Sequence, residues 1–231
     1  MEQLSPKKPL LLLFDVYGTL LDMALVEKKV NALLNSKRGY AFWFEIFMQY
    51  CFVDNCLQSF HPFGDIAKAT LQMTARMVGE SINENQAEEV LELLHHLPLR
   101  EDEIENISKL RDLDLRMAAL TNAPQEVIES RMEKTGLVSY FEAVLSAETV
   151  RKYKPALEVY QWASKKLDVD AKDILFISSH SWDVAGAANA GMQTAYLYQD
   201  NQISYPLADT PDCTIAGLND LCDLLKNQYY Q

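Results

Sequence analysis

The sequence predicts an α/β fold, a doubly wound parallel sheet with an inserted helical cap. Three observations support this fold class. Short apolar runs alternate along the chain with segments of helical periodicity, and polar residues directly follow several of these runs. About one hundred residues separate the first run from the second, far more than one crossover helix needs. The long connection therefore predicts an insertion into the sheet domain.

The composition is that of a globular protein. At 231 residues, with 48% hydrophobic and 23% charged residues, the chain can form one doubly wound domain or a core with a small insertion. The net charge is −12 and the Lys and Arg residues are scattered, so we expect no nucleic-acid partner. The apolar stretch near the start, Leu10–Phe14, is too short for a bilayer and lacks a signal-peptide cleavage site. The four cysteines form no CxxC pair. We expect a cytoplasmic protein with reduced thiols and no membrane association.

Five apolar runs are expected to be strands. The first, Leu10–Phe14, is continuous and stops at Asp15, with Gly18 three residues later, as in a central strand that ends in a tight loop. The other four runs are Leu115–Leu120, Ala143–Ser146, Ile174–Ser178 and Thr194–Tyr198. Helices are expected between them over Pro124–Thr135, Pro155–Leu167 and Asp183–Ala190. This alternation predicts parallel strands joined by helical crossovers.

The sequence predicts helices throughout the insertion. We expect residues 23–97 to form a cap, and residues 1–22 with 98–231 to form the α/β core. The segment Tyr40–Val53 is apolar nearly all round, Phe63-Gly64 breaks the pattern, and a second helix is expected from about Asp65 to Val78. Ser81 and Glu84 have the spacing of a capping box ahead of the run Ala87–Leu97, and Pro98 should end that run.

Four polar segments are each expected at the carboxyl end of a predicted strand. They are Asp15-Val-Tyr-Gly-Thr-Leu-Leu-Asp22, Thr121-Asn122, Lys154-Pro155 and Ser178-Ser-His-Ser-Trp-Asp183. Pro155 suits the first turn of a helix, which would put Lys154 at its mouth. Open α/β sheets bind their ligands at the carboxyl ends of the strands, so we expect these segments to form one site.

The residue types in this site favour covalent catalysis by a carboxylate. Asp15 would be the nucleophile, and the charge of Lys154 would keep it ionised. Backbone N–H groups of residues 15–19, with the hydroxyls of Thr121 and Ser178, could bind the anionic group of a small-molecule substrate. Asp183 could orient Lys154 or a water molecule. On the residues alone, Thr121-Asn122 also fits a plain helix cap, and His180 a polar loop residue.

These segments resemble the motifs of the haloacid dehalogenase superfamily. The stretch from Leu13 to Asp22 is similar to its first motif, and Leu120-Thr121-Asn122, Lys154-Pro155 and Trp182-Asp183 are similar to the other three, in the same order. Within the superfamily the chain is most similar to the L-2-haloacid dehalogenase branch. The signs are Tyr17 in place of a second aspartate, Tyr160 six residues after Lys154, and the Ser178-Ser-x-x-Trp-Asp pattern.

The resemblance implies that Asp15 displaces halide from a short 2-haloalkanoic acid to form an aspartyl ester, which water held by polar groups around Asp183 then hydrolyses. The implied catalytic residues are Asp15, Lys154, Asp183, Thr19 and Ser178. The implied substrate-binding residues are Tyr17, Thr121, Asn122, Tyr160, His180, Trp182, Phe44 and Met48. A phosphate monoester hydrolase, and a protein of this fold without efficient turnover, are the alternatives.

Several replacements refine this expectation. Phosphatases of the superfamily hold Mg²⁺ partly through a carboxylate where this chain has Ser179, so we expect no required metal or other cofactor. The phenol of Tyr17, with an ordinary pKa of about 10, is a poor substitute for the acid that a phosphatase uses. Phe44 stands where the branch has its halide-binding arginine, and His180 where it has an asparagine; Arg38 or Arg76 could reach in instead. The resemblance and the apolar first long cap helix also suggest a homodimer.

Overall fold

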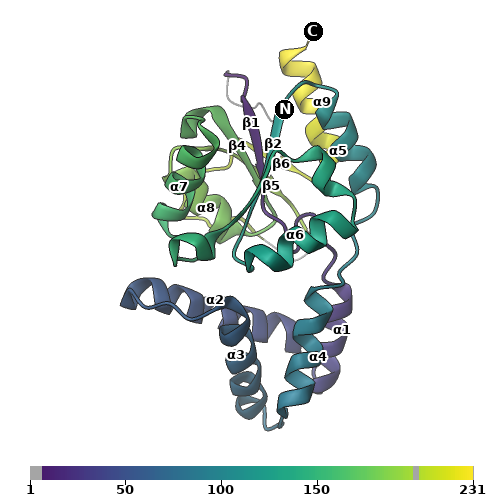
Figure 1. The fold of residues 1–231 in the computed structure, drawn as a ribbon, viewed down its shortest axis with the longest axis vertical. Coiled ribbons are helices and arrows are strands. Elements are labelled where there is room, and N and C mark those ends of the chain that lie inside the picture. Colours follow the sequence, from purple (N-terminus) through teal and green to yellow (C-terminus); the bar gives the residue numbers. More distant parts are fainter. Residues whose placement is uncertain (1–6, 200–202, 231) are drawn as a thin grey trace.

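The computed structural model describes residues 7–199 and 203–230. Within these residues the chain forms a six-stranded parallel sheet between helices, with a separate group of helices at one end of it (Figure 1). The strands are β1 (Leu11–Phe14), β2 (Arg116–Thr121), β3 (Ala143–Ser146), β4 (Ile174–Ser178), β5 (Gln193–Leu197) and β6 (Cys213–Ile215). Their order in the sheet is β3-β2-β1-β4-β5-β6, so the α/β class and the parallel sheet are confirmed.

The central position of β1 follows from its composition. All four of its residues are fully buried, and Phe14 is in register with Ala119 of β2 on one side and Ile177 of β4 on the other. The strand order reverses between β1 and β4, which is the point where open α/β sheets bind ligands. The residues that follow β1, β2 and β4 therefore meet at this point.

Helices cover both faces of the sheet. They are α5 (Glu103–Arg111), α6 (Gln125–Lys134), α7 (Leu157–Leu167), α8 (Ser181–Asn189) and α9 (Leu218–Tyr229), with 3-10 turns at Leu137–Tyr140, Ala147–Val150 and Ala171–Asp173. Leu12 and Phe14 belong to the apolar cluster that includes α5, α6 and α9, whereas Leu11 and Leu13 belong to the cluster that includes α7 and α8. This alternation is the period of two that a strand imposes on its side chains.

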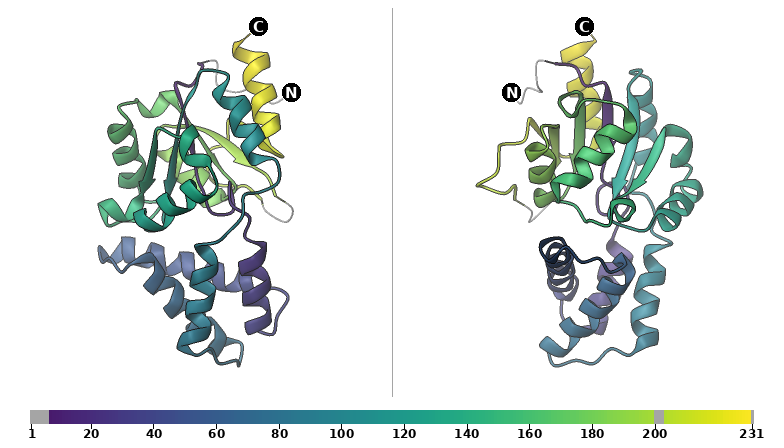
Figure 2. Two further views of the ribbon diagram at one scale, coloured as in Figure 1. Left: turned by 45° about the vertical axis from the view of Figure 1, so that its right-hand side comes forward. Right: turned by 60° about the vertical axis from the view of Figure 1, so that its left-hand side comes forward.

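The second group of helices is the segment between β1 and α5. It consists of α1 (Ala24–Leu33), α2 (Gly39–Leu57), α3 (Phe63–Met77) and α4 (Glu84–Leu94). Figure 2 shows these helices together at the end of the molecule where the carboxyl ends of the strands point. The two segments that connect this group of helices to the sheet domain are hydrogen-bonded to each other. Asp22 N–H donates to the Pro98 carbonyl (2.9 Å), and Arg100 N–H donates to the Leu20 carbonyl (3.0 Å).

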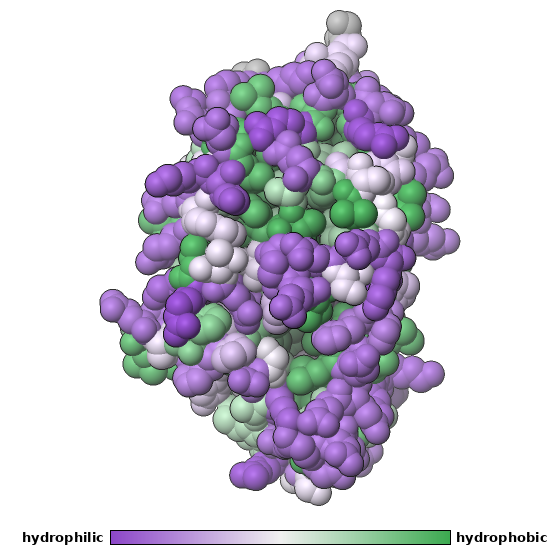
Figure 3. All heavy atoms as spheres, viewed as in Figure 1, coloured by the Kyte–Doolittle hydropathy of each residue, from purple (hydrophilic) through white to green (hydrophobic). Residues whose placement is uncertain are grey.

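The apolar character of α2 has a structural reason. Trp43 and Phe47 are buried within the cap, whereas Phe44 and Phe52 make ring contacts with residues of the core. The helix is thus covered on more than one side. No helix in the described ranges has the length and apolar character needed to cross a membrane. Figure 3 shows many hydrophilic residues on one face of the molecule, with hydrophobic ones between them.

Some local predictions were wrong. The N-cap of α4 is Asn83, which forms a reciprocal capping box with Gln86, not Ser81 with Glu84; Asn caps a helix as well as Ser does. Phe63 and Gly64 were expected to interrupt the helical pattern, but they are the first two residues of α3. The last cap helix ends at Leu94, short of Pro98.

The segment before α7 also differs. Pro155 lies outside the helix, which begins at Leu157, and the Lys154-Pro155 peptide is cis. Lys154 is therefore held by a loop and not by the first turn of a helix. The helices α1, α5 and α9 and the short strand β6 were not individually predicted.

Candidate active site

Three charged side chains meet beneath the cap. The Lys154 ammonium group donates to Asp15 Oδ1 (2.7 Å), to Asp183 Oδ2 (2.6 Å) and to the Leu120 carbonyl (3.0 Å). These three acceptors use all three of its N–H bonds. Asp15, Lys154 and Asp183 are each at most 4% exposed, so the cluster lies out of bulk water.

The charges in this cluster shift one another's pKa. Burial by itself raises the pKa of Asp15, but the charges of Lys154 and His180 and the bonds from Lys154 and Thr19 outweigh it and hold the pKa below its ordinary value. Burial lowers the pKa of Lys154, yet the two carboxylates raise it above normal overall. Burial raises the pKa of Asp183, and the neighbouring Asp15 adds to this, because one cation is shared by two carboxylates. Asp15 is thus the member kept ionised for attack.

Two asparagines hold the backbone that carries the lysine. Asn122 accepts from Lys154 N–H (2.7 Å) and donates to its carbonyl (3.4 Å). Asn55, at the end of α2, does the same for Tyr153, with distances of 3.0 and 2.7 Å. Consecutive residues are therefore clamped by the core on one side and by the cap on the other. Asn55 was not predicted from the sequence, because it is 98 residues from Tyr153 and belongs to no motif.

Other predicted residues support the charged cluster. Thr19 donates to Asp15 Oδ2 (2.8 Å), Ser178 donates to Asp183 Oδ2 (3.2 Å), and Tyr160 bonds to Asp183 Oδ1 (2.5 Å). Thr19, Ser178 and Tyr160 are all fully buried. Ser178 and Tyr160 therefore both hold the Asp183 carboxylate in place.

The nucleophile loop leaves backbone N–H groups that could bind an anion. Gly18 and Thr19 use their N–H groups within the turn, on the carbonyls of Leu21 and Val16. Across the described part of the chain, no acceptor is found for the N–H groups of Val16, Tyr17 and Asn122. Of the backbone N–H groups of residues 15–19 that were predicted to bind an anion, those of Val16 and Tyr17 are therefore available. The N–H group of Asn122, in the loop after β2, is a third such donor. Thr121 Oγ1 already accepts from Ala123 N–H (3.2 Å).

His180 lies between two aromatic rings beside the nucleophile. Its ring stacks on Phe44 of the cap (centroids 5.4 Å apart) and on Trp182 (5.2 Å). Its Nε2 is 2.9 Å from the Tyr17 carbonyl and 3.7 Å from Asp15 Oδ2. Since both of these atoms are acceptors, Nε2 carries a hydrogen. The resemblance implied that Phe44, His180 and Trp182 are each substrate-binding residues. In the structure their three rings form one stack.

The remaining predicted residues differ in their access to the site. Met48 is 4% exposed in the apolar core and lines neither the cavity between cap and core nor the groove beside His180. Arg38 lines a groove of about 1000 Å³ together with Phe44 and His180. Arg76 lines a different hollow on the cap surface.

The site does not fit a magnesium ion. The Tyr17 carbonyl, two residues after Asp15, is bonded to His180 Nε2. Both oxygens of Asp183 are bonded to Lys154, Ser178 or Tyr160. In residues 7–199 and 203–230 there is no group of three or more His, Cys, Asp or Glu side chains arranged to hold a metal ion. Mg²⁺ needs several free hard oxygens.

Comparisons with known proteins give a consistent result. A family model of haloacid dehalogenase-like hydrolases matches residues 10–191. An (S)-2-haloacid dehalogenase of Pseudomonas sp. (strain YL) is 25% identical over 215 residues, covering 92% of this chain and 93% of the relative. (S)-2-haloacid dehalogenase 2 of Pseudomonas sp. (strain CBS-3) is 27% identical over 217 residues, covering 92% and 94%.

Solved structures share the fold. The L-2-haloacid dehalogenase from Xanthobacter autotrophicus with chloropropionic acid covalently bound aligns with a TM-score of 0.82 at 22% identity, covering 94% of this chain and 98% of that one. Another L-2-haloacid dehalogenase aligns with a TM-score of 0.88 at 23% identity, covering 95% and 100%.

Proposed function

The chain belongs to the haloacid dehalogenase-like hydrolases, and on this premise we propose that it removes halide from 2-haloalkanoic acids with Asp15 as the nucleophile. The observation that supports this proposal most is the buried contact between Asp15 and Lys154. In addition, positions 17 and 179 carry Tyr and Ser and not carboxylic acids. The relatives named (S)-2-haloacid dehalogenase support the choice of substrate.

The reaction has two steps. In the first, an oxygen of Asp15 attacks the carbon that bears the halogen, and the bonding electron pair leaves with the halide. The backbone N–H groups of Val16, Tyr17 and Asn122 would hold the substrate carboxylate. In the second, water attacks the ester carbonyl and breaks its bond to the alkyl oxygen. This frees Asp15 and a 2-hydroxy acid, and one proton passes to solvent. Lys154, bonded to Oδ1, would stabilise the oxyanion.

A halide leaves without a proton, whereas the alkoxide of a phosphate ester must receive one. Burial raises the pKa of Tyr17 above its ordinary value, which corrects the expectation of an unperturbed phenol. The phenol is therefore a still weaker acid than expected. The direct test is to measure chloride release from 2-chloropropionate beside phosphate release from an aryl phosphate. Chloride release alone supports the proposal; phosphate release alone would overturn it.

Turnover is expected to be independent of Mg²⁺. The reason is that His180 and Lys154 already bond the oxygens that a metal would need. Chloride release should stay within about twofold after treatment with EDTA and after addition of Mg²⁺, since no metal step contributes to the barrier. Loss of activity in EDTA with recovery in Mg²⁺ would contradict this.

An arginine at position 44 is expected to increase chloride release from 2-chloropropionate. Phe44 stacks on His180, and a ring offers a leaving anion only its weakly positive edge. A charged donor stabilises developing charge, so Phe44→Arg should raise kcat at least about tenfold. Phe44→Leu, which removes the ring without adding a donor, is the control. A folded Phe44→Arg protein no faster than Phe44→Leu would show that position 44 does not face the halide.

Breaking the hydrogen bonds between Asn55 of the cap and the loop that carries Lys154 is expected to change kcat more than KM. Asn55→Ala breaks both bonds to the Tyr153 backbone, and a small displacement of Lys154 should lower kcat by about 10- to 100-fold with little change in KM. Asn55→Asp keeps the acceptor for Tyr153 N–H and should recover part of the loss. Cys56→Ala, at the exposed neighbour, is the matched control. Equal kinetics for Asn55→Ala and Cys56→Ala would count against the clamp.

A further inference from the structure

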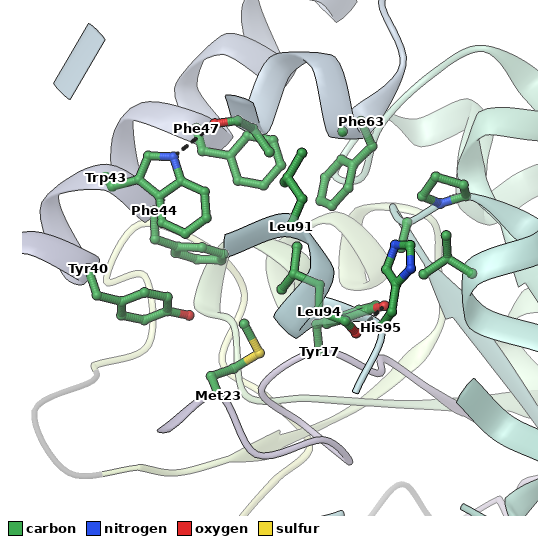
Figure 4. A pocket seen from close by; sticks show the side chains of 15 residues that line it. Tyr17, Met23, Tyr40, Trp43, Phe44, Phe47, Phe63, Leu91, Leu94 and His95 are labelled. Carbon is green, nitrogen blue, oxygen red and sulfur yellow. Dashed lines mark hydrogen bonds between the residues drawn. The ribbon is translucent and has the colours of Figure 1, made fainter. Parts of the chain in front are cut away.

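An apolar cavity of about 120 Å³ lies between the cap and the core (Figure 4). Figure 4 shows rings of α2, among them Trp43, Phe44 and Phe47, on one side of it, with Leu91 and Leu94 of α4 nearby. The core contributes Tyr17 and the segment Ala123-Pro124, so the wall is built from both parts of the molecule.

The wall offers few polar groups to a ligand. The Trp43 indole N–H donates to the Ala67 carbonyl (3.2 Å) and to Thr70 Oγ1 (3.3 Å). The Tyr17 hydroxyl lies 3.5 Å from the Leu94 carbonyl, within the same wall. A cavity lined in this way selects a ligand by apolar surface and shape.

The cavity adjoins the groups that would hold the reacting end of a substrate. Tyr17 and Ala123 each follow, within two residues, a part of the proposed site, Asp15 and Asn122 respectively. Phe44 lines the cavity and also stacks on His180, whose Nε2 is 3.7 Å from Asp15 Oδ2. A substrate carboxylate on the free N–H groups and a reacting carbon at Asp15 would therefore place the rest of the substrate toward the cavity.

We propose that this cavity receives the side chain of the substrate and that the preferred substrates are 2-halo acids with a phenyl-sized or branched apolar tail. The proposal rests on the proposed function. Its size argument is direct: an apolar cavity of about 150 Å³ in another protein binds benzene, whereas the methyl group of 2-chloropropionate would leave most of 120 Å³ empty. Burying each further methylene group should improve binding about fourfold.

The first experiment measures binding without turnover. Isothermal titration calorimetry would compare propionate with 3-phenylpropionate, neither of which carries a halogen. Burial of the phenyl group should make 3-phenylpropionate bind about 10- to 100-fold more tightly. Equal affinity for the two acids would overturn the proposal, whatever the enzyme's reaction.

A cavity-filling variant makes the test specific. Gly64 lines the cavity, and a Cβ added there would meet no atom within 4 Å. Gly64→Leu should abolish most of the preference for 3-phenylpropionate and leave propionate binding unchanged. Gly217→Leu is the matched control, because a Cβ at Gly217 also meets no atom within 4 Å and this residue lies at the start of α9, in the core. If Gly64→Leu and Gly217→Leu behave alike, the tail does not occupy this cavity.

A second experiment separates this proposal from the proposed function. Chloride release would be compared for 2-chloropropionate, 2-chlorohexanoate and 2-chloro-3-phenylpropionate. A kcat/KM that rises at least tenfold along this series supports both ideas. Chloride release with no dependence on the tail keeps the function and overturns the cavity assignment. No chloride release from any acid, with selective binding of 3-phenylpropionate, overturns the function and keeps the cavity assignment.

Discussion

Replacing Asp15 by asparagine is expected to lower turnover by about 10⁴-fold or more, as removal of a covalent nucleophile does in other hydrolases. An amide oxygen carries no full negative charge with which to attack the carbon. The charge of Lys154, which keeps Asp15 ionised by lowering its pKa, cannot restore that negative charge to an amide. The loss should appear in kcat, measured as chloride release under saturating 2-haloalkanoic acid.

The structure provides a way to separate chemistry from folding in this test. Lys154 keeps its contact with Asp183 when Asp15 is changed, so Asp15→Asn should melt close to the unmodified protein. Asp112→Asn makes the same substitution at an exposed position after α5 and should leave activity unchanged. Retention of more than a few per cent of the activity by a folded Asp15→Asn protein would refute the assignment of the nucleophile.

Replacing Lys154 by methionine is expected to affect both stability and rate. The change leaves two buried carboxylates without their shared cation. Removing one partner of a buried ion pair costs about 3–5 kcal/mol of the free energy of unfolding. Turnover should fall by about 10³-fold, because the group that stabilises the ester's oxyanion is lost. Urea unfolding and chloride release would measure the two effects.

The pH dependence gives this variant a distinct signature. In the unmodified protein the pKa of Asp15 is below its ordinary value, so Asp15 is ionised at and above that value and activity falls only as the pH drops through the lowered pKa. Without the lysine charge, burial dominates and the pKa of Asp15 rises. The acid limb of the activity profile of Lys154→Met should therefore move to higher pH.

A double variant keeps this prediction testable if the single one is too unstable. Lys154→Met with Asp183→Asn removes one of the two unpaired carboxylates, so stability should be partly restored while activity stays low. A Lys154→Met protein with normal stability and activity within tenfold of the unmodified protein would show that the ammonium group is not needed.

The site was predictable where its residues lie next to regular structure. Leu11–Phe14 is apolar at every position, as a strand buried on both faces requires, and Asp15 follows it directly. Thr121 and Ser178 end the two strands beside it, so the strand order brings these segments together. The resemblance to a known family then suggested the chemistry.

Other features depend on contacts that no local pattern encodes. Asn55 bonds to a residue 98 positions away, and its neighbours in the sequence do not distinguish it from any polar residue near the end of a helix. Tyr160 was expected at the substrate and Ser178 among the catalytic residues; the packing of α7 against α8 brings the Tyr160 hydroxyl to Asp183, to which Ser178 at the end of β4 also donates. Which of several nearby polar groups faces a ligand is decided by burial, which arises only when the elements are packed.

By itself, therefore, the sequence determined the parallel sheet, the motifs at its carboxyl edge and the family, because strand periodicity and motif order are properties of short segments. Only the tertiary structure decided that Phe44, His180 and Trp182 form one stack, that the cap clamps the lysine loop, and that an apolar cavity lies between the cap and the core. Each of these arises where the cap meets the core. Their geometry depends on how two surfaces fit, and long-range packing of this kind leaves no periodic signal along the chain.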